Sequence, residues 1–315
     1  MASKIKYFYL TDGFIGLSCL RDLIKENYIP ELIITHKSLQ DSKPSEEIIE
    51  SLKELSVSRN IPLLIIEKLK EYKGKIKNFH LGICVGFMEI LGEDIFNSPL
   101  LGIYNLHCGK LPEYRGRAPI SRAIINGDSK ITMTVHKIEG GVDSGAILLE
   151  NDIYIEDEDD VNSVYKKCSD FAGNLIKNVF GLIELNNLLV YPENINKLLT
   201  PQKEYKNSAY KSITYKERII NWDKPAKEIY NLIRALTPPY PSAITYYKAE
   251  ELIITKARII ENDSVNKISG YIEKVSNNSI IVRCSKGTIE LKEILHNEKK
   301  MDNISEIFKT GDILK

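Results

Sequence analysis

Over its first 200 residues the chain alternates short apolar runs with longer charged, amphipathic stretches. A short apolar run between turn residues is typical of a buried strand, and a longer amphipathic stretch is typical of a helix. Regular alternation of the two predicts βα units and a parallel sheet. The expected strands are Lys6–Leu10, Glu31–His36, Pro62–Glu67, His80–Val85 and Gly102–Leu106, followed by the pair Lys130–Ile138 and Ala146–Tyr154.

Helices are expected to connect these strands, beginning after a turn at Thr11–Gly16. This turn lacks the Gly-x-Gly-x-x-Gly pattern, so no dinucleotide cofactor is predicted. The acidic run Asp157–Asp160 is interpreted as the solvated start of a helix rather than a metal site, since acidic residues complement the helix dipole there. The expected helices run from that turn to about Glu26 and over Ile48–Asn60, Leu91–Pro99, 117–127 and Val161–Leu185.

The pattern changes after the long helix. Pro192–Lys206 is polar and contains two prolines, which is typical of a linker. Short β-like runs then follow, namely Glu251–Ile259, Ser269–Lys274, Ser279–Cys284 and Thr288–Leu291. We therefore expect a first domain over residues 1–191, a linker over 192–206 and a second domain over 207–315.

Composition excludes several classes of protein. The chain balances 43 Lys and Arg against 43 Asp and Glu and shows no basic stripe, so nucleic acid is not an expected partner. No run approaches the ~18 apolar residues of a membrane span. The apolar start Ile5–Leu20 is interrupted by Asp12 and followed by Arg21, which indicates a strand and a helix rather than a signal peptide. The five scattered cysteines lack metal-ligand spacing, which favours reduced thiols, a cytoplasmic location and no zinc site.

Polar side chains suited to acyl chemistry gather between residues 105 and 145. Asn105 and His107 close the fifth expected strand, the loop Leu111–Gly116 reads Leu-Pro-Glu-Tyr-Arg-Gly, and Asp143 lies between two later strands. Sites in open α/β sheets form beyond the carboxyl ends of strands, where these residues are expected to lie. A single His here could be a hydrogen-bonded core residue and Asp143 a turn residue, but their ordered combination favours a site.

This combination resembles the folate-dependent formyltransferases, above all the branch that formylates nucleotide-linked amino sugars. That family has the pattern N-x-H-x-S-L-L-P-x-Y-R-G and, further along, a catalytic Asp. The chain departs from the pattern at Cys108-Gly109-Lys110. The matching positions are Asn105, His107, Leu111, Pro112, Tyr114, Arg115, Gly116 and Asp143.

The resemblance extends into the tail, where Tyr215–Trp222 and Ile233–Ala243 match the family's connecting helix and Pro-rich turn. It implies an α/β fold in which a Rossmann-like parallel-sheet formyltransferase domain precedes a small OB-like β-barrel domain. It also implies transfer of a formyl group from N10-formyltetrahydrofolate to an amine, without a metal.

Formyl transfer passes through a tetrahedral oxyanion, so it needs a hydrogen-bond donor for that oxygen and an acceptor for the amine's proton. The resemblance assigns these catalytic roles to three residues. Asn105 is a neutral donor, and His107 is a base or a donor. Asp143 orients the imidazole or relays a proton.

The resemblance further implies two binding regions. The pterin is expected against the loop after the fourth strand and the segment before Asp143, although Gly140-Gly141 could be a plain turn. For Arg115 we favour a structural role in the Pro112–Gly116 loop, which leaves Lys110 as the better phosphate contact. The candidate folate-binding residues are Glu89, Ile90, Leu91, Arg117, Glu139, Gly140, Gly141 and Val142. The candidate acceptor-binding residues are Asp12, Gly13, Phe14, Lys110 and Arg115.

Two acceptors compete. One is a nucleotide-linked amino sugar, a dTDP- or UDP-4-amino sugar used for cell-surface polysaccharides such as lipopolysaccharide O-antigen. The other is charged initiator tRNA, the substrate of methionyl-tRNA formyltransferases. The loop Lys37–Glu47 is short and not basic, the turn at Thr11–Phe14 lacks the Gly-Thr-Pro of the tRNA enzymes, and Arg117 is typical of the sugar branch. These features favour the sugar.

Two other functions on the same fold are less consistent with the sequence. A non-catalytic binding protein would be expected to lack one of the three catalytic residues. A formyl-tetrahydrofolate hydrolase would be expected to carry an extra N-terminal regulatory domain. Monomer and homodimer both stay open.

Overall fold

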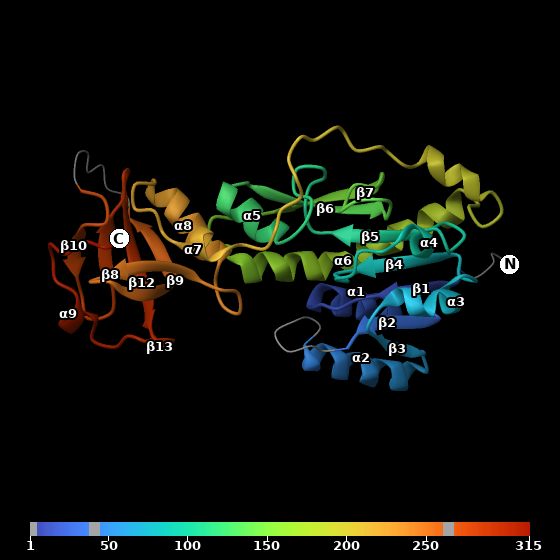
Figure 1. The fold of residues 1–315 in the computed structure, drawn as a ribbon, viewed down its shortest axis with the longest axis horizontal. Coiled ribbons are helices and arrows are strands. Elements are labelled where there is room, and N and C mark those ends of the chain that lie inside the picture. Colours follow the sequence, from blue (N-terminus) through green and yellow to red (C-terminus); the bar gives the residue numbers. More distant parts are fainter. Residues whose placement is uncertain (1–4, 38–44, 261–267) are drawn as a thin grey trace. The chain divides into compact units, whose positions relative to one another are not determined.

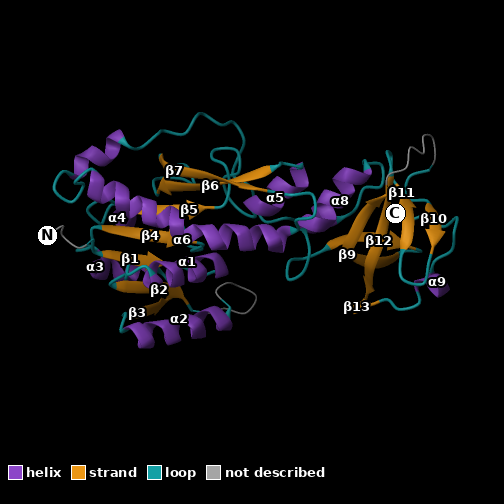
Figure 2. Cartoon of the chain, turned by 180° about the vertical axis from the view of Figure 1, so that it is seen from behind, coloured by secondary structure: helices purple, strands orange, loops and turns teal. Residues whose placement is uncertain are grey.

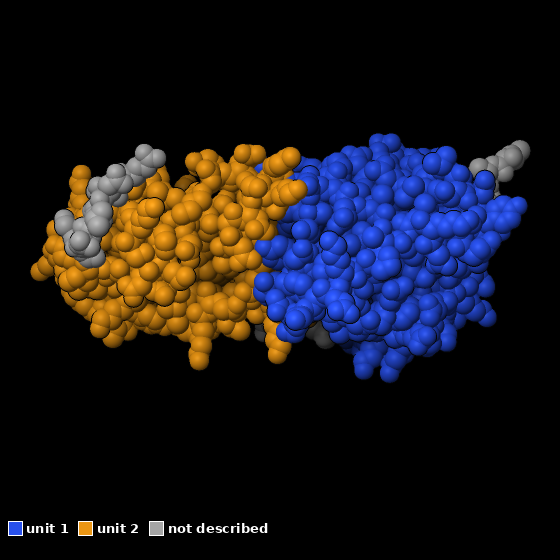
Figure 3. Space-filling model, turned by 90° about the horizontal axis from the view of Figure 1, so that it is seen from above, with its two compact units in different colours: residues 1–116, 131–153, 165–210 blue, residues 117–130, 154–164, 211–315 orange. Residues whose placement is uncertain are grey.

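The structure is a computed structural model that describes residues 5–37, 45–260 and 268–315. Its two compact units are not continuous in sequence (Figure 3). Unit 1 comprises Met1–Gly116, Ile131–Ile153 and Tyr165–Tyr210, and unit 2 comprises Arg117–Lys130, Tyr154–Val164 and Lys211–Lys315. The expected linker, 192–206, therefore belongs to unit 1.

Unit 1 is built on a seven-stranded sheet in the order β3-β2-β1-β4-β5-β6-β7 (Figure 1). The first five strands in this order are parallel, and β6 runs antiparallel to β5. This confirms the expected Rossmann-like sheet. The strands are β1 (Tyr7–Leu10), β2 (Leu32–His36), β3 (Leu63–Ile66), β4 (Leu81–Val85), β5 (Ile103–His107), β6 (Lys130–Lys137) and β7 (Ile147–Tyr154).

The helices of unit 1 follow the expected connections. Ser45 caps the start of α2, where its side chain accepts a hydrogen bond from the backbone of Ile48, and Asn60 caps its end in the left-handed conformation. Residues 38–44 of the expected Lys37–Glu47 loop lie outside the described residues. The helices are α1 (Phe14–Lys25), α2 (Glu46–Arg59), η1 (Leu69–Tyr72), α3 (Lys73–Ile76), α4 (Glu93–Phe96), most of α6 (Val161–Leu185), and η2 (Pro192–Lys197).

Burial explains why the parallel strands read as continuous apolar runs. Every residue of β1 and of β4 is buried, as expected where helices cover both faces of a sheet. Figure 2 shows α2 beside β3 at one edge of the sheet and β7 at the other. Gly82 is required within β4, because a Cβ there would lie 2.5 Å from the Phe8 ring. The strands of the sheet are therefore closely packed, and their ends can hold the residues of a site in place.

Unit 2 contains a six-stranded sheet, and the strand pairs within its described residues are all antiparallel. The indole of Trp222 lies in its core and donates to Oγ1 of Thr245 at 2.9 Å. The described pairings run from β10 to β8 without closing, so the OB-like barrel stays a prediction. The elements are α5 (Pro119–Asn126), α7 (Tyr215–Arg218), α8 (Ala226–Ala235), β8 (Ala243–Tyr247), β9 (Glu250–Ile260), β10 (Ile272–Val275), β11 (Ile280–Arg283), β12 (Thr288–His296), β13 (Lys299–Lys300) and α9 (Ile304–Ile307).

The acidic run Asp157–Asp160 directly precedes α6 (Val161–Leu185), at the expected helix start, but its Asp159 is buried and not solvated. Oδ1 of Asp160 accepts from the backbone N–H of Ser163 at 2.9 Å, and Oδ1 of Asp159 accepts from the Ser163 hydroxyl at 2.8 Å. The buried Arg234 donates to the carbonyl of Asp159 at 2.7 Å. Among the described residues, no three His, Cys, Asp or Glu are grouped to hold a metal ion. No helix in the described part of the chain is long and apolar enough to cross a bilayer.

Candidate active site

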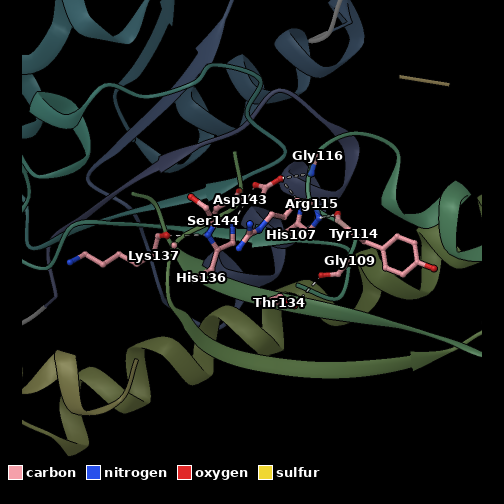
Figure 4. Close-up of polar contacts among 12 residues, drawn as sticks. His107, Gly109, Tyr114, Arg115, Gly116, Thr134, His136, Lys137, Asp143 and Ser144 are labelled. Carbon is pink, nitrogen blue, oxygen red and sulfur yellow. Dashed lines mark hydrogen bonds and ion pairs between the residues drawn. The ribbon is translucent and has the colours of Figure 1, made fainter. Parts of the chain in front are cut away.

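The candidate catalytic residues come together at the carboxyl end of β5, entirely within unit 1. Figure 4 shows two of them, His107 and Asp143, with His136 beside them. Asn105 and His107 are two residues apart on β5, so their side chains lie on one face of the strand. Asp143 comes from the turn between β6 and β7. Nδ1 of His107 lies 3.6 Å from Oδ2 of Asp143. The structure thus brings the predicted trio to one place.

The His107 ring has a defined tautomer. Its Nε2 lies 2.7 Å from the carbonyl oxygen of Tyr114, which can only accept, so Nε2 carries a proton. Burial lowers the pKa of His107, against the opposing effects of Asp143 and the Tyr114 carbonyl. The neutral ring therefore presents an unprotonated Nδ1 on the side of Asp143, and this nitrogen can accept a proton.

A second histidine completes the cluster and was missed by the sequence prediction. His136 on β6 lies opposite Asn105 in the β5–β6 register. Its Nδ1 is 3.0 Å from the carbonyl of Lys137, and its Nε2 is 3.1 Å from Nδ2 of Asn105 and 3.4 Å from Oδ1 of Asp143. His136 therefore orients the Asn105 amide and uses one of that amide's two hydrogens.

Asp143 is held as a carboxylate. Burial alone would raise its pKa. At the low pH where this carboxyl titrates, however, the positive charge on the protonated His107 ring, together with the adjacent His136 and the hydrogen bond from the Gly116 backbone, holds the pKa of Asp143 well below its usual range. The Gly116 N–H donates to Oδ2 of Asp143 at 2.9 Å. The Tyr-Arg-Gly loop is thereby tied to the catalytic turn.

Cys108 follows His107 but is not activated as a nucleophile. A hydrogen bond with Cys168 on α6, together with burial, raises the pKa of the Cys108 thiol. A protonated thiol is a poor nucleophile. Cys108 is therefore a packing residue beside α6.

All the candidate folate residues except Arg117 lie on two loops beyond the ends of β4 and β6, in unit 1. Ile90 is 76% exposed and Val142 is 42% exposed, whereas Leu91 packs into the core beneath the sheet. Glu89 is directed inward, where its Oε2 accepts from the backbone N–H of Leu69 at 2.8 Å. Leu91 therefore does not offer an exposed apolar surface to a ligand. Glu139, Gly140 and Gly141 occupy the exposed turn before Asp143, and Arg117 belongs to unit 2.

The Thr11–Gly16 turn has an inward and an outward part. Phe14 is 62% exposed and follows Gly13, which begins α1. Asp12 is fully buried, and its carboxylate accepts from the backbone N–H groups of His36 and Met88, each at 2.9 Å. The side chain of Asp12 therefore ties β1 to β2 and β4 rather than facing solvent.

His36 extends this buried cluster. Its Nδ1 lies 2.7 Å from Oδ2 of Asp12, and its Nε2 lies 3.1 Å from Oε2 of Glu89. Burial would lower the pKa of His36, but the two carboxylates more than offset it and raise the pKa. A ring between two carboxylates can donate to both only as an imidazolium. His36 therefore stabilises the loop that carries Glu89 and Ile90.

The two basic candidates near β5 have different partners. Lys110 is exposed and lies 3.0 Å from Oε1 of Glu113. Nε and Nη2 of Arg115 donate to Oε1 of Gln202 at 2.9 and 2.6 Å. The favoured structural role of Arg115 agrees with these contacts, and Lys110 keeps its ammonium at the surface.

Comparison with known proteins identifies the family. A family model described as formyl transferase matches residues 18–180, and one described as formyl transferase, C-terminal domain, matches residues 212–311. The chain belongs to the formyl transferase family. The two matched regions together span most of the chain, as the sequence resemblance implied.

The relatives of this formyl transferase have names that describe different activities. The bifunctional polymyxin resistance protein ArnA of Wigglesworthia glossinidia brevipalpis is 32% identical over 96% of the chain, which spans only 45% of that protein. A methionyl-tRNA formyltransferase of Clostridium tetani (strain Massachusetts / E88) is 32% identical over 99% of the chain and 98% of the relative. The solved structure of WlaRD, a sugar 3N-formyl transferase, has a TM-score of 0.65 at 20% identity and covers 94% of this chain and 99% of its own. The protein is therefore a formyl transferase enzyme with the fold of WlaRD.

Proposed function

We propose that this formyl transferase moves the formyl group of N10-formyltetrahydrofolate onto the primary amine of a nucleotide-linked amino sugar, a dTDP- or UDP-4-amino sugar, as a step toward cell-surface polysaccharide. One observation supports the transfer step most directly. The neutral His107 ring is fixed by its bond to Tyr114, so its unprotonated Nδ1 is available beside Asp143, at 3.6 Å.

His107 accepts a proton from the attacking amine through Nδ1. The imidazolium that results is stabilised by the ionised carboxylate of Asp143, which is why a depressed pKa at Asp143 matters. The remaining amide hydrogen of Asn105 donates to the oxyanion that develops on the formyl group. Proton transfer from His107 to the departing nitrogen then restores the neutral ring.

The loops beyond β4 and β6 have the chemistry that a pterin requires. N10-formyltetrahydrofolate supplies the formyl carbon and a nitrogen leaving group when bound. Three exposed side chains there provide apolar surface for a flat ring. They are Met88, Ile90 and Val142, which are 46%, 76% and 42% exposed. The surrounding backbone of Gly140 and Gly141 provides donors and acceptors without side chains in the way.

For the acceptor, the loop composition and the fold favour a sugar nucleotide. Residues 37–47 contain two Lys against three acidic residues, which is unsuited to gripping a tRNA acceptor stem. The solved structure of WlaRD was obtained with dTDP and 5-N-formyl-THF, and its fold matches nearly the whole of this chain. Phe14 offers an exposed ring at the Thr11–Gly16 turn, and Lys110 offers a flexible point charge for a phosphate.

A specific observation also supports methionyl-tRNA formyl transfer. The Clostridium tetani relative of that name is as similar as ArnA, at 32%, and spans the same length as this chain. We keep this as the second candidate function, because the two activities would share Asn105, His107 and Asp143.

The acceptor is tested by direct competition. The purified protein is incubated with N10-formyltetrahydrofolate and with UDP-4-amino-4-deoxyarabinose, a dTDP-4-amino sugar, a dTDP-3-amino sugar or charged initiator tRNA, each in a separate assay. We expect a formamide product with one of the sugar nucleotides and no product with the tRNA. Lys110→Ala should raise KM for that sugar, and Lys216→Ala, an exposed Lys of unit 2, serves as the matched control. Efficient formylation of the tRNA, at the rate of the best sugar, would replace the sugar by the second candidate.

A further inference from the structure

A segment expected to be a linker is bound into unit 1 beside the candidate active site. Thr200 pairs with Ile147 of β7 through two backbone hydrogen bonds of 2.8 Å. Further along, the backbone N–H of Tyr210 donates to the carbonyl of Arg115 at 2.8 Å. Residues 200–210 therefore run from β7 to the Tyr-Arg-Gly loop, and Gln202 lies between these two attachments.

The Gln202 side chain makes four hydrogen bonds in this position. Its Nε2 donates to the carbonyls of Asp143 and Gly145, both at 2.8 Å. Its Oε1 accepts from Nε and Nη2 of Arg115 at 2.9 and 2.6 Å. Only one orientation of the amide is possible, since the reverse would place its oxygen against two carbonyls and its NH2 against guanidinium donors.

The turn that Gln202 holds is a strained one. Asp143 has a φ of +47°, in the left-handed region that an L-residue rarely adopts. Such a conformation is unfavourable for an L-residue and persists only where the surroundings hold it. Gln202 fixes the carbonyl of Asp143, while the N–H of Gly116 holds its carboxylate at 2.9 Å. The backbone and the side chain of Asp143 are thus anchored separately.

We propose that Gln202 is a positioning residue for formyl transfer, which couples the Arg115 guanidinium to the backbone of the turn that carries Asp143. This rests on the proposed function, since it takes Asp143 as the partner of His107. The guanidinium polarises the Gln202 amide and strengthens both bonds to the turn, because hydrogen bonds in a chain reinforce each other. Arg115 then acts through Gln202 and not on the substrate.

Removal of the amide should affect turnover rather than binding. In Gln202→Ala the turn loses two donors, and Asp143 moves relative to His107. We expect kcat to fall about 10²-fold, as small displacements of catalytic groups do, while both KM values stay within a few-fold. Gln202→Glu keeps an acceptor for Arg115 but faces two carbonyls with a carboxylate, so it should lose as much. Arg115→Ala combined with Gln202→Ala should lose little more than the worse single variant.

The matched control is Ser144→Ala. Ser144 donates from its hydroxyl to the carbonyl of Gly140 at 2.8 Å, a side-chain bond to the same turn that does not touch Asp143. Its kcat should stay within a few-fold of wild type. A control with the same loss as Gln202→Ala would show that any change in this turn is damaging and would overturn the specific role of Gln202.

A second readout needs no substrate. The chain has five His, so their ring signals can be followed by NMR as pH is changed. The charge of Asp143 raises the pKa of His107, so its displacement in Gln202→Ala should lower the pKa of His107 further. Ser144→Ala should leave that titration in place. An unchanged His107 titration in Gln202→Ala, or an unchanged kcat, contradicts the proposal. Wild type without activity on any acceptor would instead contradict the proposed function, while the titration would still decide the role of Gln202.

Discussion

Nδ1 of His107 and Oδ2 of Asp143 lie 3.6 Å apart, beyond the length of a hydrogen bond. The opposite nitrogen of the ring is already bonded to Tyr114, at 2.7 Å. Asp143 therefore acts on the neutral ring by its charge and leaves Nδ1 unprotonated. His107 is thus an unprotonated base, and the Asp143 carboxylate already lies where it can stabilise the protonated ring.

The first prediction concerns the three catalytic residues. Asn105→Ala, His107→Ala and Asp143→Ala should each lower kcat by about 10²–10⁴-fold, the range typical of oxyanion donors and general bases. Combined variants should lose much less than the product of the single losses, because the groups act as a unit. Steady-state kinetics with the preferred acceptor measure this. Near-normal turnover in two of the three would refute the assignment.

The second prediction concerns the pH dependence of kcat/KM. Because burial lowers the pKa of His107 below its ordinary 6.5, the base stays active at neutral pH, and activity should fall only as pH drops through this lowered pKa. Asp143 raises the pKa of His107, so its removal should lower it. The acidic limb of Asp143→Asn should therefore lie at lower pH than that of wild type, with a lower plateau. An acidic limb displaced to higher pH would contradict this electrostatic role.

The catalytic trio could be predicted from the sequence because it depends on spacing along one strand and one turn. Asn105 and His107 share a strand face by their separation of two, and Asp143 lies in a turn bounded by glycines. His136 and Gln202 could not be predicted in this way. His136 reaches Asn105 only through the β5–β6 register, and Gln202 reaches Asp143 only because residues 200–210 pack along unit 1.

The same contrast applies to the fold. The parallel strands were predicted within a few residues because their apolar runs are short and well separated. β8 was missed because Ala243–Tyr247 follows directly on a Pro-rich turn, where its five residues read as the end of that turn. Leu91 is buried while its neighbour Ile90 is exposed, a difference that the sequence of a loop does not reveal.

The third prediction concerns His36 and the pH dependence of stability. The pKa of His36 is raised in the folded protein. Its contribution to the free energy of unfolding is therefore fully present below the unfolded pKa of 6.5 and is lost as pH rises through the folded pKa. Burial lowers the pKa of His80, which accepts from the Lys6 backbone N–H at 2.9 Å. The contribution of His80 to the free energy of unfolding is therefore present at high pH and is lost as pH falls through its folded pKa.

Urea denaturation at about pH 5 and about pH 9 distinguishes the two histidines. The loss of unfolding free energy in His36→Gln should be larger at the lower pH, and that in His80→Gln larger at the higher pH. Equal losses at both pH values in His36→Gln would show that the ring is not held as an imidazolium between Asp12 and Glu89.

The fourth prediction concerns Gly116, which ties the Tyr-Arg-Gly loop to Asp143. It has a φ of +96°, and a Cβ there would lie 2.3 Å from the carbonyl oxygen of Tyr210. Gly116→Ala should therefore lower the free energy of unfolding by about 1–3 kcal/mol or more. Gly74→Ala, in α3 with nothing within 4 Å of the added carbon, should be neutral or stabilising by up to about 1 kcal/mol. Equal stabilities of the two variants in urea denaturation would contradict the close approach at Gly116.

The central claim is tested most directly by following the formyl carbon itself. The protein, in molar excess over N10-formyltetrahydrofolate labelled with carbon-13 in the formyl group, is mixed with the preferred amino-sugar nucleotide and observed by NMR in a single turnover. We predict that the label appears as a sugar formamide with wild type and that its appearance is slowed at least about 10²-fold with His107→Ala. Release of the label as free formate, or transfer at the wild-type rate by His107→Ala, would contradict the account.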